Sequence, residues 1–244
     1  MKAVMSIAGI DPSGGAGLYT DLAVIRRLGF YPCGVVTALT YQNTCEIRGV
    51  YELDQQVIAN QISSVLDDLD VVAVKIGLVG SSADAIADLI KDIKIKVVDP
   101  VLKSTTGFDF SNLNVYKSLA RVCDVITPNV DEAQVLAGCK IKDIESAKDC
   151  AKRIFGMFGC AVVITGGKLG GIDVIFDGDE FYTVKSDIYD YEVHGTGCVY
   201  SSALTCYLAK GYDLFKACEF ARVFVLEAVK NSLNVGRCLR VVNP

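Results

Sequence analysis

The sequence predicts an α/β fold, with one domain over residues 1–244, a mostly parallel central sheet, helices on both faces and an antiparallel edge. Short apolar runs typical of buried parallel strands alternate with longer segments whose apolar residues recur about every 3.6 residues. In the C-terminal third, two apolar runs flank Asp177-Gly178-Asp179, which is typical of a β-hairpin. Hydrophobic residues make up 51% of the chain and charged residues 22%, which suits a large core.

Each predicted strand is a short apolar run bounded by glycine, proline or aspartate. The parallel strands are predicted at 2–8, 33–39, 71–77, 95–99, 124–127 and 160–165. The helical patterns between and after them cover 15–28, 55–69, 82–92, 111–121, 130–138, 144–157, 198–210 and 213–231. Repetition of strand, helix and strand predicts βαβ units and hence a parallel sheet. The runs 172–176 and 180–184 predict an antiparallel pair at one edge, and no linker or repeat divides the chain.

The charge balance excludes several classes of partner. The chain has 24 basic and 29 acidic residues, a net charge of −5. An acidic chain has no general attraction to nucleic acid or to anionic lipid, so a phosphorylated ligand must be held locally. The N-terminal apolar run is too short for a signal peptide, and no run approaches the ~18–20 residues of a membrane span. We therefore expect a soluble cytoplasmic protein that binds neither nucleic acid nor membrane.

The ten cysteines contain no C-x-x-C pair, and His194 is the one histidine. This pattern predicts neither a disulfide framework nor a zinc site. Cysteines scattered through apolar runs behave as small buried hydrophobes, as in a reducing compartment.

Ligands of a parallel α/β sheet bind beyond the carboxyl ends of the strands. The loops expected there are rich in glycine, asparagine, aspartate and threonine: Gly9–Gly17, Thr40–Asn43, Lys75–Gly80, Asp99–Gly107, Thr127–Glu132, Thr165–Gly171 and His194–Cys198. The first loop matches no dinucleotide fingerprint, and Gly167-Lys168 is followed by Leu169 rather than by the Ser or Thr of a Walker A motif. A tight turn explains the first loop equally well. Asp21, one helical turn later, could project into the same pocket.

The strongest local signal is His194-Gly195-Thr196-Gly197-Cys198, which leads into a helical pattern. Glycines at a helix N-terminus leave backbone N–H groups free, and the helix dipole favours an anion such as phosphate there. Cys198 lies in the first turn, where the same field lowers the pKa of a thiol. The alternative is a capped turn with a small buried cysteine.

Three further groups suggest chemistry but also have ordinary explanations. Asn129 and Glu132 are spaced to share one face of a first helical turn, and with Asp99 they suit a hydrated Mg²⁺ beside phosphates. An acidic helix start and an Asp-Pro turn are the alternatives. The Gln42 amide can donate and accept together, as an amino-substituted heterocycle requires, or it caps loop backbone. Lys168 is either a cation near phosphates or a solvated lysine.

In their order along the chain, these motifs closely resemble the hydroxymethylpyrimidine/phosphomethylpyrimidine kinases of thiamine synthesis, within the ribokinase-like kinases. The residues that carry the resemblance are Ala8-Gly9, Asp11-Pro12-Ser13-Gly14-Gly15-Ala16-Gly17, Thr37-Ala38-Leu39, Gln42-Asn43-Thr44, Lys75-Ile76-Gly77, Asp99-Pro100-Val101, Thr127-Pro128-Asn129, Glu132-Ala133 and His194-Gly195-Thr196-Gly197-Cys198. The resemblance implies a ribokinase-like domain that phosphorylates the pyrimidine and its monophosphate with ATP and Mg²⁺. It also implies that no fused thiamine-phosphate synthase domain follows.

The resemblance also implies site roles. The substrate side would comprise Asp21, Gln42, Leu78, Val101 and Gly9, with Asp21 and Gln42 on the aminopyrimidine edge. Gly195, Thr196 and Gly197 would form the anion hole for the transferring phosphoryl group, and Cys198 stands where the wider superfamily usually has an aspartate base. The nucleotide side would comprise Asn129, Thr165 and Lys168, and the metal would be organised by Glu132 and Asp99 with Asn129.

The chain departs from the family at Thr105-Thr106-Gly107-Phe108, where Lys/Thr-Ser-Gly-Asp is common, so no role for that Lys or Asp is transferred. Pyridoxal kinase is the runner-up because it shares the fold and can share the cysteine. A non-catalytic regulator that binds nucleotide or thiamine precursors would not need Cys198, and a thiol redox protein would need a partner cysteine nearby. The oligomeric state is open, and a homodimer is compatible with the sequence.

Overall fold

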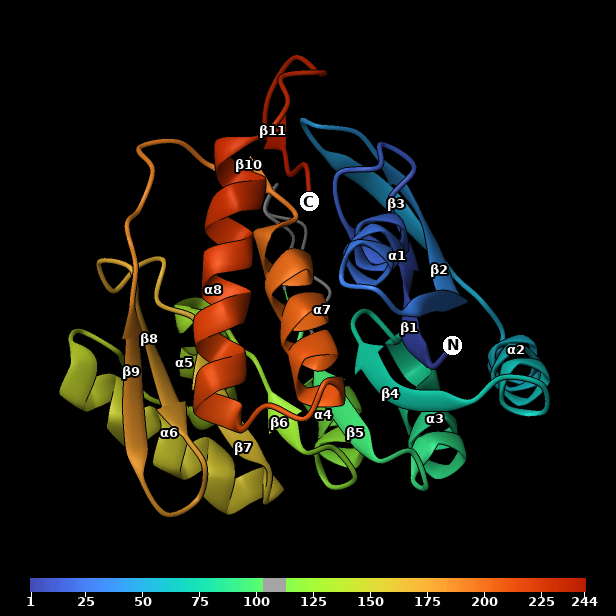
Figure 1. Cartoon of the computed structure of the whole chain (residues 1–244), viewed down its shortest axis with the longest axis horizontal. Helices are drawn as coiled ribbons and strands as arrows, with labels where there is room; N and C mark the ends of the chain where they lie inside the picture. Colours follow the sequence, from blue (N-terminus) through green and yellow to red (C-terminus); the bar gives the residue numbers. More distant parts are fainter. Residues whose placement is uncertain (103–112) are drawn as a thin grey trace.

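The computed structural model describes residues 1–102 and 113–244 and confirms the α/β fold class (Figure 1). Within these residues the parallel part of the sheet has the order β2-β1-β4-β5-β6-β7. These strands are β1 (Ala3–Ile10), β2 (Tyr31–Gln42), β4 (Val71–Ile76), β5 (Ile95–Val98), β6 (Val125–Ile126) and β7 (Ala161–Ile164). All were predicted, because a strand buried on both faces is a nearly continuous apolar run.

The sheet is antiparallel at both edges rather than at one. The predicted hairpin forms as β8 (Ile172–Phe176) and β9 (Phe181–Lys185) beside β7. At the other edge, β3 (Ile47–Glu52) pairs antiparallel with β2 and was not predicted, because this half-exposed strand mixes polar residues and glycine with its apolar ones. A separate parallel pair joins β10 (Val193–His194) to β11 (Arg240–Val241), each too short to leave a pattern in the sequence.

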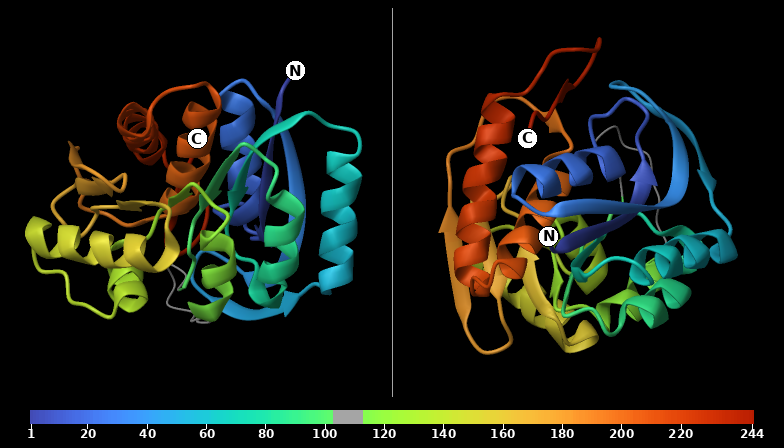
Figure 2. Two further views of the ribbon diagram at one scale, coloured as in Figure 1. Left: turned by 90° about the horizontal axis from the view of Figure 1, so that it is seen from below. Right: turned by 45° about the vertical axis from the view of Figure 1, so that its right-hand side comes forward.

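Helices cover both faces of the sheet, as predicted. On one face lie α1 (Gly17–Arg27), α7 (Thr196–Ala209) and α8 (Leu214–Lys230). On the other lie α2 (Gln55–Leu66), α3 (Ala83–Ile90), α4 (Leu113–Ala120), α5 (Val130–Ala137) and α6 (Ile144–Phe158), with a short 3₁₀ turn at Gly80–Ser82. Figure 1 shows α7 and α8 in front of the sheet, and Figure 2 shows the same grouping from two other sides.

Apolar clusters fill the space between the sheet and the helices on both of its faces. Successive residues of a strand point to opposite faces, and in β5 Val97 packs in the core under α7 and α8 while Val98 packs in the core over α3 to α6. The carboxyl ends of the strands are therefore held in place by packing on both faces of the sheet. None of the described helices is long and apolar enough to cross a membrane.

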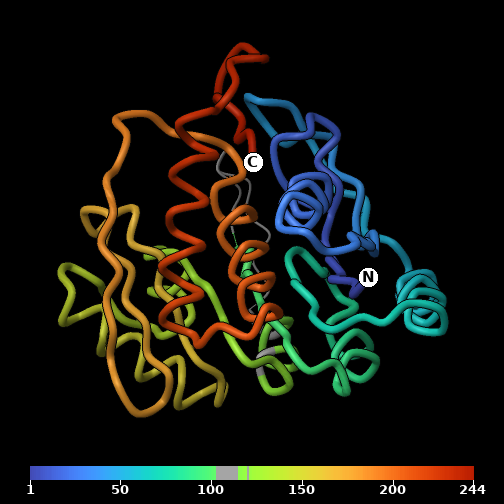
Figure 3. Tube along the Cα trace, in the orientation of Figure 1, coloured from blue at the N-terminus to red at the C-terminus, as the bar shows by residue number. Residues whose placement is uncertain are grey.

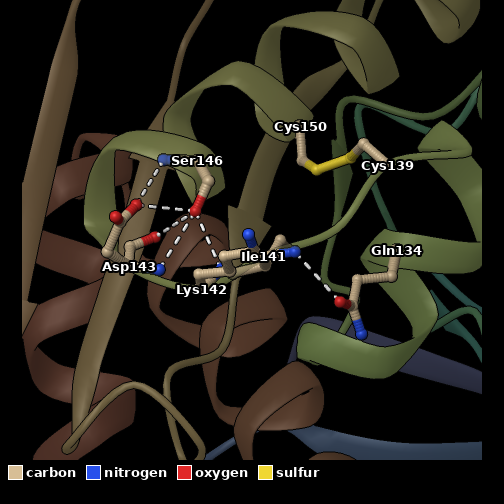
Figure 4. Close-up of a disulfide and its surroundings, with 7 residues drawn as sticks. All are labelled: Gln134, Cys139, Ile141, Lys142, Asp143, Ser146 and Cys150. Atoms are coloured by element: carbon tan, nitrogen blue, oxygen red, sulfur yellow. Dashed lines mark hydrogen bonds between the residues drawn. A yellow bond between two sulfur atoms is a disulfide. The ribbon is translucent and has the colours of Figure 1, made fainter.

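The expectation that no disulfides form was wrong. Cys139 after α5 is bonded to Cys150 in α6, next to the Asp143–Ser146 cap that begins that helix (Figure 4). Cys45 is bonded to Cys238, 193 residues further along the chain. Figure 3 shows the C-terminal segment, in red, at the same end of the molecule as the tip of the β2–β3 hairpin. Such a pairing depends on the tertiary fold and leaves no signature in cysteine spacing.

Candidate active site

A cavity of about 230 Å³ lies beyond the carboxyl ends of the parallel strands. Its lining brings together most of the residues that the sequence singled out: Gly9, Gln42, Leu78, Asp99, Val101, Asn129, Glu132, Thr165, Gly195, Thr196, Gly197 and Cys198. They come from loops far apart in the sequence, and the parallel sheet gathers them because every βα loop opens at the same edge. Asp21 and Lys168 are not among the lining residues.

Asp21 lies behind the cavity wall and is fully buried on α1. Its carboxylate accepts hydrogen bonds from Ser6 Oγ at 2.6 Å and Ser202 Oγ at 2.8 Å, and it pairs with Lys75 Nζ at 2.9 Å. The expectation that Asp21 binds substrate directly is therefore not met in this structure. Asp21 lies among the buried residues of α1, so its carboxylate reaches Lys75 rather than the cavity.

Lys75 is the residue that sequence reasoning missed. It is 1% exposed, yet it lines the cavity floor from the end of β4. Its ammonium group also lies 3.6 Å from Asp99 Oδ2. Although burial alone would lower it, the attraction of the Asp21 and Asp99 carboxylates holds the pKa of Lys75 above its usual value, so this group is a cation at neutral pH. A lysine inside the apolar run 71–77 was the available signal.

The loop before α7 forms the expected helix N-terminus at the cavity. Gly195 is the N-cap residue, with a φ of 92°, and the helix continues through Thr196, Gly197 and Cys198. A side chain at Gly195 would overlap the backbone oxygen of Gly15, so this glycine lets the first and last loops of the site touch. The first N–H groups of the helix face the place where an anion can bind.

Substituting Gly195 by alanine should destabilise the protein and weaken phosphate binding. A positive φ and a backbone overlap together should cost about 1–3 kcal/mol of unfolding free energy. Urea unfolding measures this loss. Gly167→Ala is the matched control, because no atom lies within 4 Å of its added Cβ, and it should change stability by less than about 0.5 kcal/mol. Equal effects of the two substitutions would contradict the prediction.

Cys198 does not have the lowered pKa expected from its helix position. Burial raises the pKa of its thiol to about 12, and Asp21 and Asp99 add to that rise. Lys75 and the backbone N–H of Gly17 act in the opposite direction but do not prevail. The dipole of α7 acts on Cys198 from its own helix, whereas Asp21 lies on α1 and Asp99 follows β5. The sequence near Cys198 therefore did not reveal these two carboxylates. In the empty site Cys198 is a thiol at neutral pH.

Asn129 and Glu132 form a reciprocal capping box at the start of α5. Asn129 Oδ1 accepts from the Glu132 amide at 3.0 Å, and Glu132 Oε2 accepts from the Asn129 amide at 2.8 Å. The ordinary explanation of this pair is therefore correct, but both residues also line the cavity. Burial and the charge of Asp99 raise the pKa of Glu132 to about 8.

The repulsion between Glu132 and Asp99 is what a divalent cation relieves. Mg²⁺ prefers one or two carboxylates together with phosphate oxygens and water. Among the described residues, no group of three or more His, Cys, Asp or Glu side chains is arranged to hold a metal. These two carboxylates therefore fit a magnesium site that the phosphates of a ligand help to complete.

Gln42 lies on the opposite wall, at the end of β2 rather than in the loop expected from the sequence. Its amide contacts His194 Nε2 at 2.8 Å and Asp11 Oδ2 at 3.3 Å. Neither Asp11 nor His194 had been given a role from the sequence, although both flank glycine-rich motifs.

On the remaining side, Thr165 follows β7 and lines the cavity. Lys168 lies further out, with 69% of its side chain exposed, and pairs with Asp131. Lys168 therefore does not line the cavity, and its contact with phosphate stays a prediction. The divergent segment Thr105-Thr106-Gly107-Phe108 lies outside the described residues.

Comparisons with known proteins identify the family. A family model described as phosphomethylpyrimidine kinase matches residues 11–243. The chain is 36% identical over 251 residues to a hydroxymethylpyrimidine/phosphomethylpyrimidine kinase of Aquifex aeolicus, with 98% of each chain covered.

Solved structures are also similar. A phosphomethylpyrimidine kinase of Clostridium difficile superposes with a TM-score of 0.82 at 34% identity and covers 94% of this chain and 100% of its own. A pyridoxal kinase of Staphylococcus aureus in complex with AMP-PCP and pyridoxal gives a TM-score of 0.89 at 30% identity, covering 99% of this chain and 93% of that one.

Proposed function

This chain belongs to the phosphomethylpyrimidine kinase family, and we propose that it phosphorylates hydroxymethylpyrimidine and then the pyrimidine monophosphate, with ATP as donor. One observation carries the proposal. The glycine-rich start of α7 and Cys198 line the same cavity as Gln42 and Thr165, which end β2 and follow β7 respectively, at the two edges of the parallel part of the sheet. A phosphoryl group bound at the helix N-terminus would lie between a heterocycle on one side and a nucleotide on the other.

The reaction needs positioning and charge neutralisation more than covalent chemistry. Gly195, Thr196 and Gly197 would stabilise the transferring phosphoryl group with backbone N–H groups, and Lys75 supplies a buried positive charge below them. Cys198 would accept the proton of the substrate hydroxyl. An acidic protein can thus hold polyphosphate without a basic surface.

The substrate side would be formed by Gln42, Leu78, Val101 and Gly9, all of which line the cavity. Asp21 would contribute through Lys75 rather than by touching the pyrimidine. Asn129 and Thr165 would contact the nucleotide, and Lys168 would have to leave Asp131 to join them.

We further propose that Mg²⁺ binds at Asp99 and Glu132, which share the cavity. When bound, the ion neutralises phosphate charge and orients the transferring group. Glu132 must release its proton to bind it, because its pKa is raised to about 8. The homodimer and the cytoplasmic location stay predictions.

A single-turnover reaction with hydroxymethylpyrimidine, Mg²⁺ and ATP, followed by mass spectrometry, tests the function. The expected products are the monophosphate and then the diphosphate, with stoichiometric ADP. ADP formation without a phosphorylated pyrimidine would refute the proposal.

Pyridoxal is the second candidate substrate, because the Staphylococcus aureus kinase that resembles this chain binds it. Comparing kcat/KM for the two alcohols in a coupled assay separates the candidates. A higher kcat/KM for pyridoxal would reassign the main activity.

Replacing Gln42 by leucine should raise KM for the pyrimidine while leaving ATP binding unchanged. Loss of the amide leaves a heterocycle edge unpaired at a cost of about 1–3 kcal/mol, or roughly 5- to 150-fold in KM. Gln56→Leu is the matched control, since Gln56 is exposed on α2, away from the cavity, and its amide donates to Asn60 on the same helix. An unchanged KM in Gln42→Leu would remove Gln42 from the substrate site.

A further inference from the structure

Three polar side chains from distant parts of the chain meet on the Gln42 wall of the cavity. Asp11 follows β1, Gln42 ends β2 and His194 ends β10. His194 Nε2 lies 2.8 Å from Asp11 Oδ2 and 2.8 Å from the amide nitrogen of Gln42. All three residues line the cavity, and Asp11 and His194 are buried.

The hydrogen-bond partners of Asp11 decide which atom of the imidazole carries a proton. Asp11 Oδ1 accepts from the Ser13 amide at 2.9 Å and from the Ser13 hydroxyl at 2.7 Å. Although burial acts against it, hydrogen bonds from His194 and Ser13 hold the pKa of Asp11 below its usual value. An ionised carboxylate only accepts hydrogen bonds. His194 Nε2 therefore carries a hydrogen and donates it toward Asp11.

That assignment conflicts with an amide nitrogen facing His194, because two donors would then lie 2.8 Å apart. The other end of the amide has a matching conflict. The Gln42 oxygen lies 3.2 Å from Thr40 Oγ1. The Thr40 hydroxyl has one hydrogen, which it donates to the Ile10 carbonyl oxygen at 2.9 Å, so none is left for the Gln42 oxygen. Rotating the amide by half a turn exchanges its oxygen and nitrogen and removes both conflicts, at the cost of the longer, 3.3 Å hydrogen bond from the amide nitrogen to Asp11 Oδ2. The Nε2 hydrogen of His194 is then shared between Asp11 Oδ2 and the Gln42 oxygen.

We propose that His194 is a positioning residue for substrate recognition, which holds the Gln42 amide with its oxygen toward the imidazole. One amide N–H then donates to Thr40, and the second is left for the ligand in the cavity. Asp11 accepts the hydrogen of His194 Nε2 and thereby makes that atom a donor. It acts on the ligand indirectly, through His194 and then Gln42.

This orientation determines which edge of a heterocycle the site accepts. A ligand that meets Gln42 with a ring nitrogen or a carbonyl oxygen is paired, whereas one that meets it with N–H or C–H leaves the amide unsatisfied. The Gln42 amide alone could have matched either kind of edge. The inference rests on the proposed function for its substrate class, and it adds that the pyrimidine presents a ring nitrogen to Gln42.

The protonation of His194 can be read in the unaltered protein. The chain has one histidine, so long-range ¹H–¹⁵N NMR correlations give one set of imidazole signals. We expect the spectrum of a protonated Nε2 at neutral pH, whether or not Nδ1 is also protonated. An unprotonated Nε2 would overturn the proposal, and this result does not depend on the folding of any variant.

Selectivity is tested by calorimetry, without nucleotide, on three probes. They are hydroxymethylpyrimidine and its two analogues in which one ring nitrogen is replaced by C–H. One analogue should bind the unaltered protein at least about tenfold more weakly. His194→Phe, which keeps a ring but no donor, should reduce that penalty to less than about threefold. His194→Gln, whose amide N–H has the same reach, should restore it.

Tyr41→Phe is the control for a ring substitution next to Gln42, since Tyr41 is 57% exposed and is not one of the residues Asp11, His194 and Gln42. It should leave the penalty unchanged. The same penalty in His194→Phe as in the unaltered protein, or no penalty for either analogue, would overturn the proposal. Because binding is measured without turnover, failure of phosphoryl transfer would refute the proposed function and leave this measurement intact.

Discussion

Replacing Cys198 by alanine should lower kcat by about 10²–10⁴-fold, the usual effect of removing a positioned base. Folding and nucleotide affinity should be nearly retained, because the thiol is small and contributes no contact to the α7 N–H groups. Cys160→Ala is the matched control, since Cys160 is a buried thiol just before β7, at the opposite end of the strand from the cavity. It should leave kcat within about twofold. A near-normal kcat in Cys198→Ala would show that the helix N-terminus acts without this base.

The raised pKa of Cys198 gives this prediction a pH dependence. The thiolate is the active form, and it is present only above the thiol pKa of about 12 in the free protein. Its fraction near pH 7 is about 10⁻⁵ and grows tenfold with each pH unit, so kcat/KM should still rise between pH 8 and 10. In Cys198→Asp, which should recover part of the rate, kcat/KM should level off above about pH 9, where Glu132, with its pKa of about 8, is largely ionised. A flat profile for the unaltered protein above pH 8 would exclude the free thiolate as the base.

The same shift predicts slow alkylation of Cys198. It is the one free cysteine in the described part of the chain that is not fully buried. Iodoacetamide should therefore modify it first, at a rate that rises with pH, and bound pyrimidine should protect it. This corrects the sequence-based expectation that the helix field lowers the pKa of the Cys198 thiol.

Replacing Lys75 by methionine should lower the free energy of unfolding by about 3–5 kcal/mol, because it leaves a buried carboxylate without its cation. The ammonium group pairs with Asp21 at 2.9 Å, and both side chains are at most 1% exposed. Removing both charges in Lys75→Met with Asp21→Asn should recover part of the loss. Urea unfolding of the single and double variants measures the difference.

The control for Lys75→Met is Lys216→Met, since Lys216 forms an exposed pair with Glu219 on α8. Pairs of that kind contribute about 0–1 kcal/mol. A loss in Lys75→Met no larger than in Lys216→Met would show that the buried pair does not stabilise the cavity floor.

The central fold was predictable because its strands are buried on both faces and therefore leave unbroken apolar runs. The β3 edge was not, since half of its surface faces solvent and residues such as Arg48 and Gly49 interrupt the pattern. The β10–β11 pair was missed for a different reason. Two-residue strands carry no periodicity, and this pairing joins residues as far apart in the sequence as Val193 and Arg240.

The site was predictable to the extent that strand ends identify it. Gln42 and Asn129 were found because each follows an apolar run, and Gly195 was found because glycines precede a helical pattern. The electrostatics were not predictable, because they depend on which side chains meet across the sheet. Asp21 and Lys75 are 54 residues apart, and their pairing turns Asp21 away from the cavity. Local sequence around Cys198 likewise shows the helix start but not the carboxylates that oppose its ionisation.

The contact between the first and last loops also bears on how the protein is made. Val242 donates its backbone N–H to the carbonyl of His194 at 3.1 Å, and Val241 packs where a side chain at Gly15 would lie. In the sequence, these two valines follow every strand of the nine-stranded sheet, so a ribosome adds them after the whole sheet has been synthesised. The loop at Gly15 and His194 therefore gains this contact only once the chain has been synthesised beyond all nine strands of the sheet, and a nascent chain that stops before Val241 lacks it.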